Sequence, residues 1–249
     1  MNTKVFADPK ELGREAAKFS AAVLKKAITE QGSARILLST GASQFETITA
    51  LTQRKDIEWE KVEMFHLDEY VDLPMEHPAS FRLYLKERFT DFVNLKKVNF
   101  VNTEGDVAKN IAELTKRIKE KPIDLALIGI GENAHIAFND PPADFDTQEA
   151  FIIVNLNEKC KQQQVHEGWF KTIDDVPKQA VSLTVYQIMQ SKVILSCVPF
   201  KVKAEAVKAT LSNDLTNMVP ATMLKKHPNF NLYLDEESAA LAKQDNLLV

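Results

Sequence analysis

The amino-acid sequence predicts an α/β fold of three layers, a Rossmann-like arrangement in which helices cover both faces of a mostly parallel sheet. Short apolar runs typical of buried strands alternate with stretches in which apolar residues recur at helical spacing. Strands that alternate with helices imply right-handed crossovers and therefore parallel pairing. The chain of 249 residues has no Gly/Pro/Ser-rich linker, no block of like charge and no internal repeat, so we expect one domain over residues 1–249.

The first expected element is a helix that begins at Pro9. Asp8 can cap its N-terminus, Pro9 suits its first turn, and Gly32 ends it. The apolar run that follows predicts a buried strand leading into a loop at Ser39. The expected strands are 35–39, 62–67, 98–101, 123–130, 150–154, 193–198 and 231–234. The further expected helices are 44–53, 78–90, 106–120, 201–211 and 236–243.

The composition indicates a cytoplasmic globular protein. Hydrophobic residues make up 45% and charged residues 27% of the chain, which excludes a disordered, collagen-like or coiled-coil protein. The formal net charge of −4 gives no basic field for nucleic acid or an anionic membrane. Cys160 and Cys197 are too few for a disulfide framework and favour a reducing compartment, although one bridge stays compatible with them. We find no signal peptide and no apolar run long enough to cross a bilayer.

In an open parallel sheet, ligands bind at the carboxyl ends of the strands, which selects the loops at Ser39, Leu67 and Gly129. In the first loop, the run Ser39-Thr40-Gly41-Ala42-Ser43 joins a strand to a helix. Its small residues let the backbone approach an anion such as phosphate, which the helix dipole attracts. The alternative is a plain turn in which Ser43 caps the helix. The loop lacks the lysine of a P-loop, so a nucleoside triphosphate is not expected.

The second loop carries two adjacent carboxylates, Asp68 and Glu69, where a buried strand should emerge. Carboxylates are costly there unless they are paired, hydrogen-bonded or used. Either could be a general base with the other positioned by neighbouring donors. The alternative is that one caps the next segment while the other is solvated.

The third loop, residues 128–142, contains a candidate catalytic histidine. Its Gly129, Gly131 and Ala134 formally match the dinucleotide fingerprint G-x-G-x-x-A. We reject that match because residues 139–142, Asn-Asp-Pro-Pro, break the chain too early for the long helix that the motif requires.

The remaining feature of this loop is His135, flanked by the amide of Asn133 and the carboxylate of Asp140. A histidine held by polar partners suits proton transfer near neutral pH. The alternative is a structural hydrogen-bonding histidine. No Cys/His spacing indicates a metal site.

Together these segments resemble the glucosamine-6-phosphate deaminase (isomerase) family over most of the chain. The similar segments are residues 38–43 (the family's phosphate loop), 67–71 with 76–81 (its DEYV…HPxSY segment), 123–139 (its IDL…GHIAFN block), 203–207 (its lysine-led helix) and 227–229 (its late HP turn). The related 6-phosphogluconolactonases share the fold but usually carry a GHTASLF-like sequence at the histidine. This chain instead has His135-Ile136-Ala137-Phe138-Asn139, which favours the deaminase branch.

The resemblance implies a cofactor-free and metal-free reaction in which glucosamine 6-phosphate and water become fructose 6-phosphate and ammonia. It implies that Asp68 moves a proton between C2 and C1 of the open-chain sugar and that His135 assists ring opening, oriented by Asn133 and Asp140. The expected phosphate ligands are Ser39, Thr40, Gly41, Ala42, Ser43 and Lys203. The expected partner is a small sugar phosphate, without nucleic acid or membrane, and a homo-oligomer is compatible with the sequence.

Four positions differ from the family's usual residues. Asn133 replaces an aspartate, Ala134 a glycine and Asp140 a glutamate, and Gly168 stands where better-known members place a phosphate-binding arginine. Two alternatives to the deaminase therefore stay open at this point: a lactonase acting on a sugar-phosphate ester, and a sugar-phosphate sensor without turnover.

Overall fold

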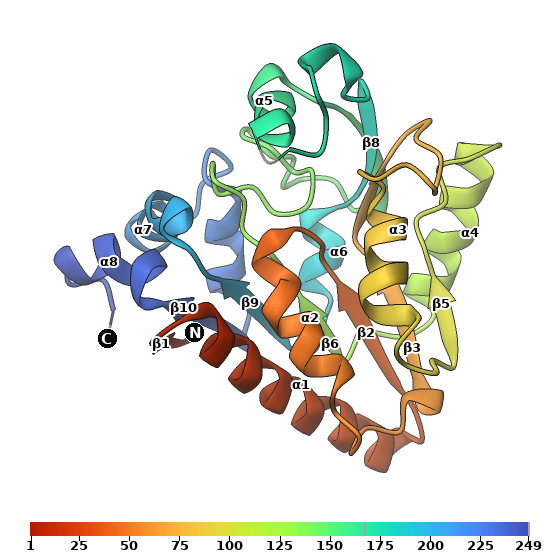
Figure 1. Ribbon diagram of the computed structural model, residues 1–249, viewed down its shortest axis with the longest axis horizontal. Helices are drawn as coiled ribbons and strands as arrows, with labels where there is room; N and C mark the ends of the chain where they lie inside the picture. Colours follow the sequence, from red (N-terminus) through yellow and green to blue (C-terminus); the bar gives the residue numbers. More distant parts are fainter. Residues whose placement is uncertain (167, 249) are drawn as a thin grey trace.

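A seven-stranded parallel sheet forms the middle layer of the computed structural model, which describes residues 1–166 and 168–248 (Figure 1). Its strand order is β1-β10-β9-β6-β2-β3-β5, and every pairing within it is parallel. The strands are β1 (Asn2–Phe6), β2 (Ala34–Leu38), β3 (Val62–His66), β5 (Lys97–Asn99), β6 (Leu125–Leu127), β9 (Ile194–Val198) and β10 (Phe230–Asp235). The parallel α/β prediction is therefore confirmed.

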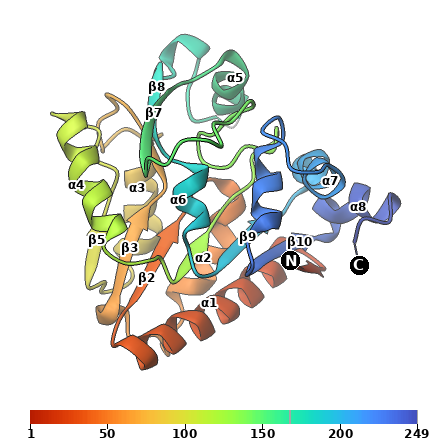
Figure 2. The ribbon, with the colours of Figure 1, turned by 180° about the vertical axis from the view of Figure 1, so that it is seen from behind.

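Helices cover both faces of this sheet. The α-helices of the described residues are α1 (Pro9–Gln31), α2 (Phe45–Thr52), α3 (Phe81–Leu85), α4 (Val107–Lys119), α5 (Glu158–His166), α6 (Val185–Met189), α7 (Ala204–Ser212) and α8 (Glu236–Gln244). Figure 1 shows α1, α2 and α3 in front of the sheet, and Figure 2, seen from the opposite side, shows α4 and α6 on the other face. Two buried apolar clusters separate the layers, one beneath α1 and α2 and the other beneath α4 and α6.

The first helix follows the capping chemistry predicted from its ends. Asp8 accepts a hydrogen bond from the backbone N–H of Glu11 at 2.8 Å, and Pro9 occupies the first turn. Gly32 ends the helix with φ 76°, a left-handed conformation that glycine adopts at little cost.

The order of the strands reverses between β2 and β6. From β2 the chain adds β3 and β5 on one side, and then crosses to place β6, β9 and β10 on the other. The loops that follow β2 and β6 diverge at this switch point and leave a crevice, which is where open α/β sheets bind ligands.

A second sheet stands at the carboxyl end of β3. It contains β4 (Asp68–Tyr70), β8 (Gln179–Leu183) and β7 (Phe151–Asn155), all antiparallel. Only Leu67 separates β3 from β4, and its carbonyl accepts a hydrogen bond from the backbone N–H of Leu183. The small sheet and α5 therefore lie over one end of the parallel sheet (Figure 1).

The sequence did not predict the elements of this second sheet correctly. The expected strand at 150–154 exists, but it pairs antiparallel with β8 and lies outside the parallel sheet. We did not expect β4, β8, α5, α6 or the edge strand β1. The charged residues of β4 and the polar run of α5 carry no periodicity that identifies their structure, and β1 is a half-exposed edge.

The expected helix at 78–90 is also shorter and irregular. It begins only at Phe81, where the hydroxyl of Ser80 accepts a hydrogen bond from the N–H of Leu83, and its second half, Lys86–Thr90, winds as a π-helix. The expected helix at 201–211 divides into a 3₁₀ turn, Lys201–Lys203, followed by α7.

One buried ion pair joins the second sheet to α3. Glu69 of β4 is fully buried, and its carboxylate accepts hydrogen bonds from the hydroxyl of Ser80 and from three backbone N–H groups, those of residues 70, 81 and 82. The guanidinium of Arg82 completes the contact at 3.1 Å and also donates to the carbonyl of Leu73. Each lone pair of the buried carboxylate thus meets a donor, which is what makes its burial tolerable.

We expect Glu69→Ala to destabilise the fold by about 3–5 kcal/mol, because it leaves a buried guanidinium and several buried donors without their acceptor. Glu104→Ala is the matched control, since Glu104 binds the same arginine at 2.7 Å with half of its side chain exposed. That change should cost about 1 kcal/mol or less. Urea denaturation measures the free energy of unfolding of both variants. Equal losses would show that the buried contact of Glu69 with Arg82 does not stabilise the fold more than the exposed one does.

Candidate functional site

A cavity of about 320 Å³ opens at the carboxyl ends of β2, β3, β6 and β9, and its size suits a small metabolite. It lies at the switch point of the parallel sheet and beneath the second sheet. The ten residues predicted to bind substrate or take part in catalysis all lie in or next to this cavity. Those that line it are Ser39, Thr40, Gly41, Ala42, Ser43, Asp68, His135 and Lys203. Asn133 and Asp140 lie behind His135 instead.

The loop after β2 presents its backbone to the cavity. Gly41 has φ 101°, a conformation that side chains other than hydrogen rarely allow. The hydroxyl of Tyr84 donates a hydrogen bond to the carbonyl of Gly41 at 2.9 Å, and burial raises the pKa of Tyr84, so this donor keeps its proton. Ser43 is not a helix cap. Its hydroxyl accepts a hydrogen bond from Gln44 at 3.1 Å and also lines the cavity.

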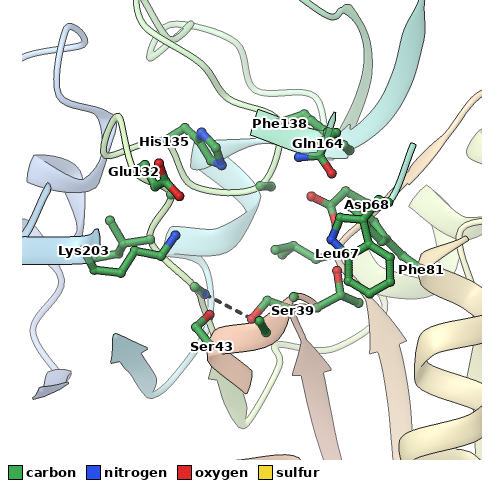
Figure 3. A pocket seen from close by; sticks show the side chains of 18 of the residues that line it. Ser39, Ser43, Leu67, Asp68, Phe81, Glu132, His135, Phe138, Gln164 and Lys203 are labelled. Carbon is green, nitrogen blue, oxygen red and sulfur yellow. Dashed lines mark hydrogen bonds between the residues drawn. The ribbon is translucent and has the colours of Figure 1, made fainter. Parts of the chain in front are cut away.

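Asp68 is the one of the two adjacent carboxylates that faces the cavity (Figure 3). It is 6% exposed, and no group in the described ranges, 1–166 and 168–248, donates a hydrogen bond to its carboxyl. Burial and the neighbouring charge of Glu69 raise the pKa of Asp68 to about 8. Glu69 points away and is fully hydrogen-bonded, so the structure resolves which of the two is available as a base.

His135 lies across the cavity from Asp68 and is supported from behind (Figure 3). Its Nδ1 lies 3.2 Å from Oδ1 of Asp140, in contact but not aligned as a hydrogen bond. The amide of Asn133 links the two: its Oδ1 accepts the backbone N–H of His135 at 3.1 Å, and its Nδ2 donates to Asp140 at 3.0 Å.

The electrostatics of Asp140 are opposite to those of Asp68. Burial acts to raise the pKa of Asp140, but His135 and the amide of Asn133 outweigh it and hold the pKa below its ordinary value. Asp140 therefore stays ionised behind the histidine. Nε2 of His135 is the ring nitrogen left to meet a ligand in the cavity.

The backbone at Gly131 makes room for the histidine ring. A Cβ atom at this position would lie 2.2 Å from Cε1 of His135 and 2.3 Å from Nε2. The turn is closed by hydrogen bonds from the N–H of Gly131 to the carbonyl of His135 and from the N–H of Ala134 to the carbonyl of Gly131. No helix follows β6 directly, so the rejection of the dinucleotide fingerprint is confirmed.

Lys203 reaches the cavity from the turn after β9. It is 8% exposed and stands just before the first residue of α7. Figure 3 shows its ammonium on the side of the cavity away from Asp68, together with the carboxylate of Glu132. Lys203, Glu132 and His135 thus lie on one side of the cavity and Asp68 on the opposite side.

Sequence analysis did not single out several lining residues. Glu132 lies inside a loop that we examined, but no pattern marked it. The aromatic or apolar walls and the α5 side of the cavity are formed by Leu67, Phe81, Phe138, Gln164, His166, Trp169, Phe200 and Val202. Gln164 and His166 of α5, and Trp169 shortly after it, belong to a polar stretch with no recognisable periodicity. Gly168 follows α5 with φ 81°, and Glu167 lies outside the described residues.

Three further features bear on the class of the protein. Within the described ranges, no three His, Cys, Asp or Glu side chains gather so as to hold a metal ion. Cys160 and Cys197 are both buried and form no disulfide. No helix in the described part of the chain has the length and apolar character needed to span a membrane.

Residues 7–233 match the family model described as glucosamine-6-phosphate isomerases/6-phosphogluconolactonase. A glucosamine-6-phosphate deaminase of Oenococcus oeni is 37% identical over 91% of this chain and 94% of its own length. Another, from Thermoanaerobacter pseudethanolicus, is 32% identical over 94% of this chain and 93% of its own length.

Solved structures share the architecture. A monomeric glucosamine-6-phosphate deaminase superimposes with a TM-score of 0.88 at 29% identity, covering 97% of this chain and 100% of that one. A 6-phosphogluconolactonase from Shewanella baltica has a TM-score of 0.77 at 16% identity over 94% of this chain and 97% of that one, a likeness of fold alone.

We expect Gly131→Ala to displace the ring of His135 while leaving the fold intact, because the new methyl group would overlap the imidazole. Gly129→Ala is the matched control, since its Cβ would lie 3.5 Å from its nearest neighbour, an ordinary contact. Imidazole NMR signals of His135 report the ring position and thermal unfolding reports the fold. An unmoved His135 signal in Gly131→Ala would contradict this geometry.

Proposed function

The chain belongs to the glucosamine-6-phosphate isomerase/6-phosphogluconolactonase family, and from this premise we propose that it is a glucosamine-6-phosphate deaminase. The reaction is an aldose–ketose isomerisation with hydrolytic loss of the amine: glucosamine 6-phosphate and water give fructose 6-phosphate and ammonia. Curated relatives of this activity align over nearly the whole chain at 32–37% identity.

The observation that carries the proposal is the unpaired, buried Asp68 opposite His135. Asp68 has a pKa of about 8, so its carboxylate binds a proton more tightly than an ordinary aspartate does. A base of this strength suits removal of a proton from the carbon next to a carbonyl. A protein that only bound a sugar phosphate would gain nothing from an unpaired buried carboxyl group, which costs stability. The geometry therefore favours turnover over a sensor.

In the proposed mechanism His135 first assists ring opening. Nε2 of its ring takes the proton of the C1 hydroxyl and delivers it to the ring oxygen as the bond between C1 and that oxygen breaks, which gives the open-chain aldehyde. Asp140, held ionised, stabilises the imidazole while it carries charge.

Asp68 then performs the isomerisation. Its carboxylate removes the proton from C2, the C–H electron pair forms the C1=C2 double bond, and the carbonyl electrons move onto O1. O1 takes a proton from the ammonium group on C2, the nitrogen lone pair that this frees forms the C2=N bond of an iminium, and the C1=C2 electrons take the proton back from the Asp68 carboxyl at C1. Water adds to C2 and ammonia leaves, which yields the ketose. The chemistry requires a positioned base and stabilisation of charge on oxygen.

The phosphate is proposed to bind between Lys203 and the loop that follows β2. Ser39 to Ser43 supply hydroxyl and backbone groups, and Lys203 supplies a positive charge. Two buried thiols without a disulfide fit a reducing compartment, so we place the enzyme in the cytoplasm.

The direct test is release of ammonia and fructose 6-phosphate from glucosamine 6-phosphate, with hydrolysis of 6-phosphogluconolactone as the control reaction. We expect the first and not the second. Lactone hydrolysis without ammonia release would place the chain in the other branch of the family, and binding without either reaction would make it a sensor.

Asp68→Asn should lower kcat by about 10²–10⁴-fold, since the amide cannot accept the proton from C2. The wild-type kcat/KM should rise with pH through about pH 8, because the base works only after it has lost its proton. A variant that keeps more than a third of wild-type kcat would show that Asp68 is not the base.

The same substitution should stabilise the fold. The folded protein holds the Asp68 proton between about pH 4 and pH 8, whereas the unfolded chain releases it, so wild-type stability falls as pH rises through this window. The amide of the Asp68→Asn variant does not titrate, and urea denaturation should show its advantage over wild type growing from pH 5 to pH 8.

Asn133→Asp should move the limb of the pH–rate profile that His135 controls to higher pH. It places a second carboxylate beside His135 and Asp140, and two negative charges favour the protonated ring. Asn133→Ala is the uncharged control. An unchanged profile in a folded Asn133→Asp protein would mean that residue 133 does not act on the histidine.

Lys203→Ala should weaken binding of glucosamine 6-phosphate by about 10–150-fold, the effect of losing one charged hydrogen bond. Lys201→Ala, which removes an exposed lysine of the same turn, should have little effect. Isothermal titration with unphosphorylated glucosamine should show no comparable loss. Equal losses for both sugars, or a larger loss at Lys201, would place the phosphate elsewhere.

A further inference from the structure

Gln164 places a side-chain amide beside Asp68 in the cavity wall (Figure 3). It belongs to α5 and is only 6% exposed. Its Oε1 accepts a hydrogen bond of 2.6 Å from the hydroxyl of Tyr70, which is itself fully buried. This contact fixes which way the amide is turned.

Tyr70 and Asp68 are two residues apart in β4, and side chains at this spacing lie on the same face of a strand. Strand β4 therefore carries Asp68 itself and also positions the amide of Gln164, through the hydrogen bond from Tyr70. With Oε1 engaged, Nε2 keeps two N–H donors, and none of the residues whose side chains the structure describes accepts a hydrogen bond from them. Nε2 is not enclosed by protein, since Gln164 lines the cavity.

The donor side of the amide opens into the cavity, so a ligand that displaces solvent there must supply an acceptor or leave the donor unpaired at a cost in free energy. The side chains of Leu67, Phe81 and Phe138 on this side of the cavity are apolar and carry no acceptor. The acceptor must therefore come from whatever occupies the space next to Asp68.

We propose that Nε2 of Gln164 donates a hydrogen bond to O1 of the open-chain sugar phosphate and is a further catalytic residue; this rests on the proposed deaminase function. When Asp68 takes the C2 proton, the C–H electrons form the C1=C2 bond and the carbonyl pair moves onto O1. Gln164 then faces the oxygen on which negative charge develops. In an apolar surrounding such a fixed donor stabilises the transition state more than the ground state.

Two substitutions separate this role from a structural one. Gln164→Ala removes the amide, whereas Gln164→Glu keeps the size and the acceptor for Tyr70 but replaces the donor with a carboxylate oxygen. Gln162→Glu is the matched control, since it adds the same charge to an exposed position of the same helix. We expect both Gln164 variants to lose about 10²–10³-fold in kcat with KM within about threefold of wild type, and the control to be unchanged.

The pH profile removes the one ambiguity of Gln164→Glu, because its added charge would also hold a proton on Asp68. That effect disappears at high pH, so kcat is compared on the plateau above the Asp68 transition, where only loss of the donor persists. Quenching of Trp169 fluorescence by glucosamine 6-phosphate confirms that the variants still bind.

Plateau kcat within threefold of wild type in either Gln164 variant would overturn the proposal, and so would a loss carried entirely by KM. Wild-type protein is assayed in parallel. If wild type releases no ammonia, the deaminase function fails and this inference fails with it; if wild type is active and the Gln164 variants are too, only this inference fails.

Discussion

The buried contact between Glu69 and Arg82 is the constraint on which the site depends. It fastens β4 to the start of α3 and uses every acceptor position of Glu69. Because side chains alternate along a strand, fixing Glu69 in the interior turns Asp68 toward the cavity. The charge of Glu69 then contributes, after burial, to the raised pKa of Asp68. A structural ion pair thus sets the direction of Asp68 and adds to the rise in pKa that burial causes.

The two carboxylates of the site, Asp68 and Asp140, have different polar partners. In the proposed function this difference makes Asp68 the base and Asp140 the support of His135. Asp140 has an amide and a histidine beside it and stays ionised, whereas Asp68 has no donor from the described residues and binds its proton more tightly. Groups whose environments push their pKa values apart are typical of acid–base catalysis. The donor side of the Gln164 amide is a further polar group that faces the cavity, while its oxygen accepts a hydrogen bond from Tyr70.

Topology brings these groups together. The reversal of strand order between β2 and β6 separates their following loops, and β3 and β9 deliver Asp68 and Lys203 to the same end of the sheet. The second sheet covers that end, and the segment between β7 and β8 adds Gln164 of α5 and Trp169. The parallel strands therefore form the floor of the cavity. The second sheet and α5, which are not part of the parallel sheet and its covering helices, form its cover.

The sequence by itself determined the parallel α/β architecture, the caps of α1 and the three loops that hold the candidate site, because apolar periodicity and capping are local and strong. Residue chemistry alone left Asp68 and Glu69 as alternatives, and only the family resemblance selected Asp68. That choice depends on Arg82 and Ser80, whose contacts with Glu69 form only after folding. The antiparallel pairing of β7 and the position of Gln164 were likewise decided by tertiary structure, since hydrogen-bond partners between distant segments leave no periodic trace in the chain.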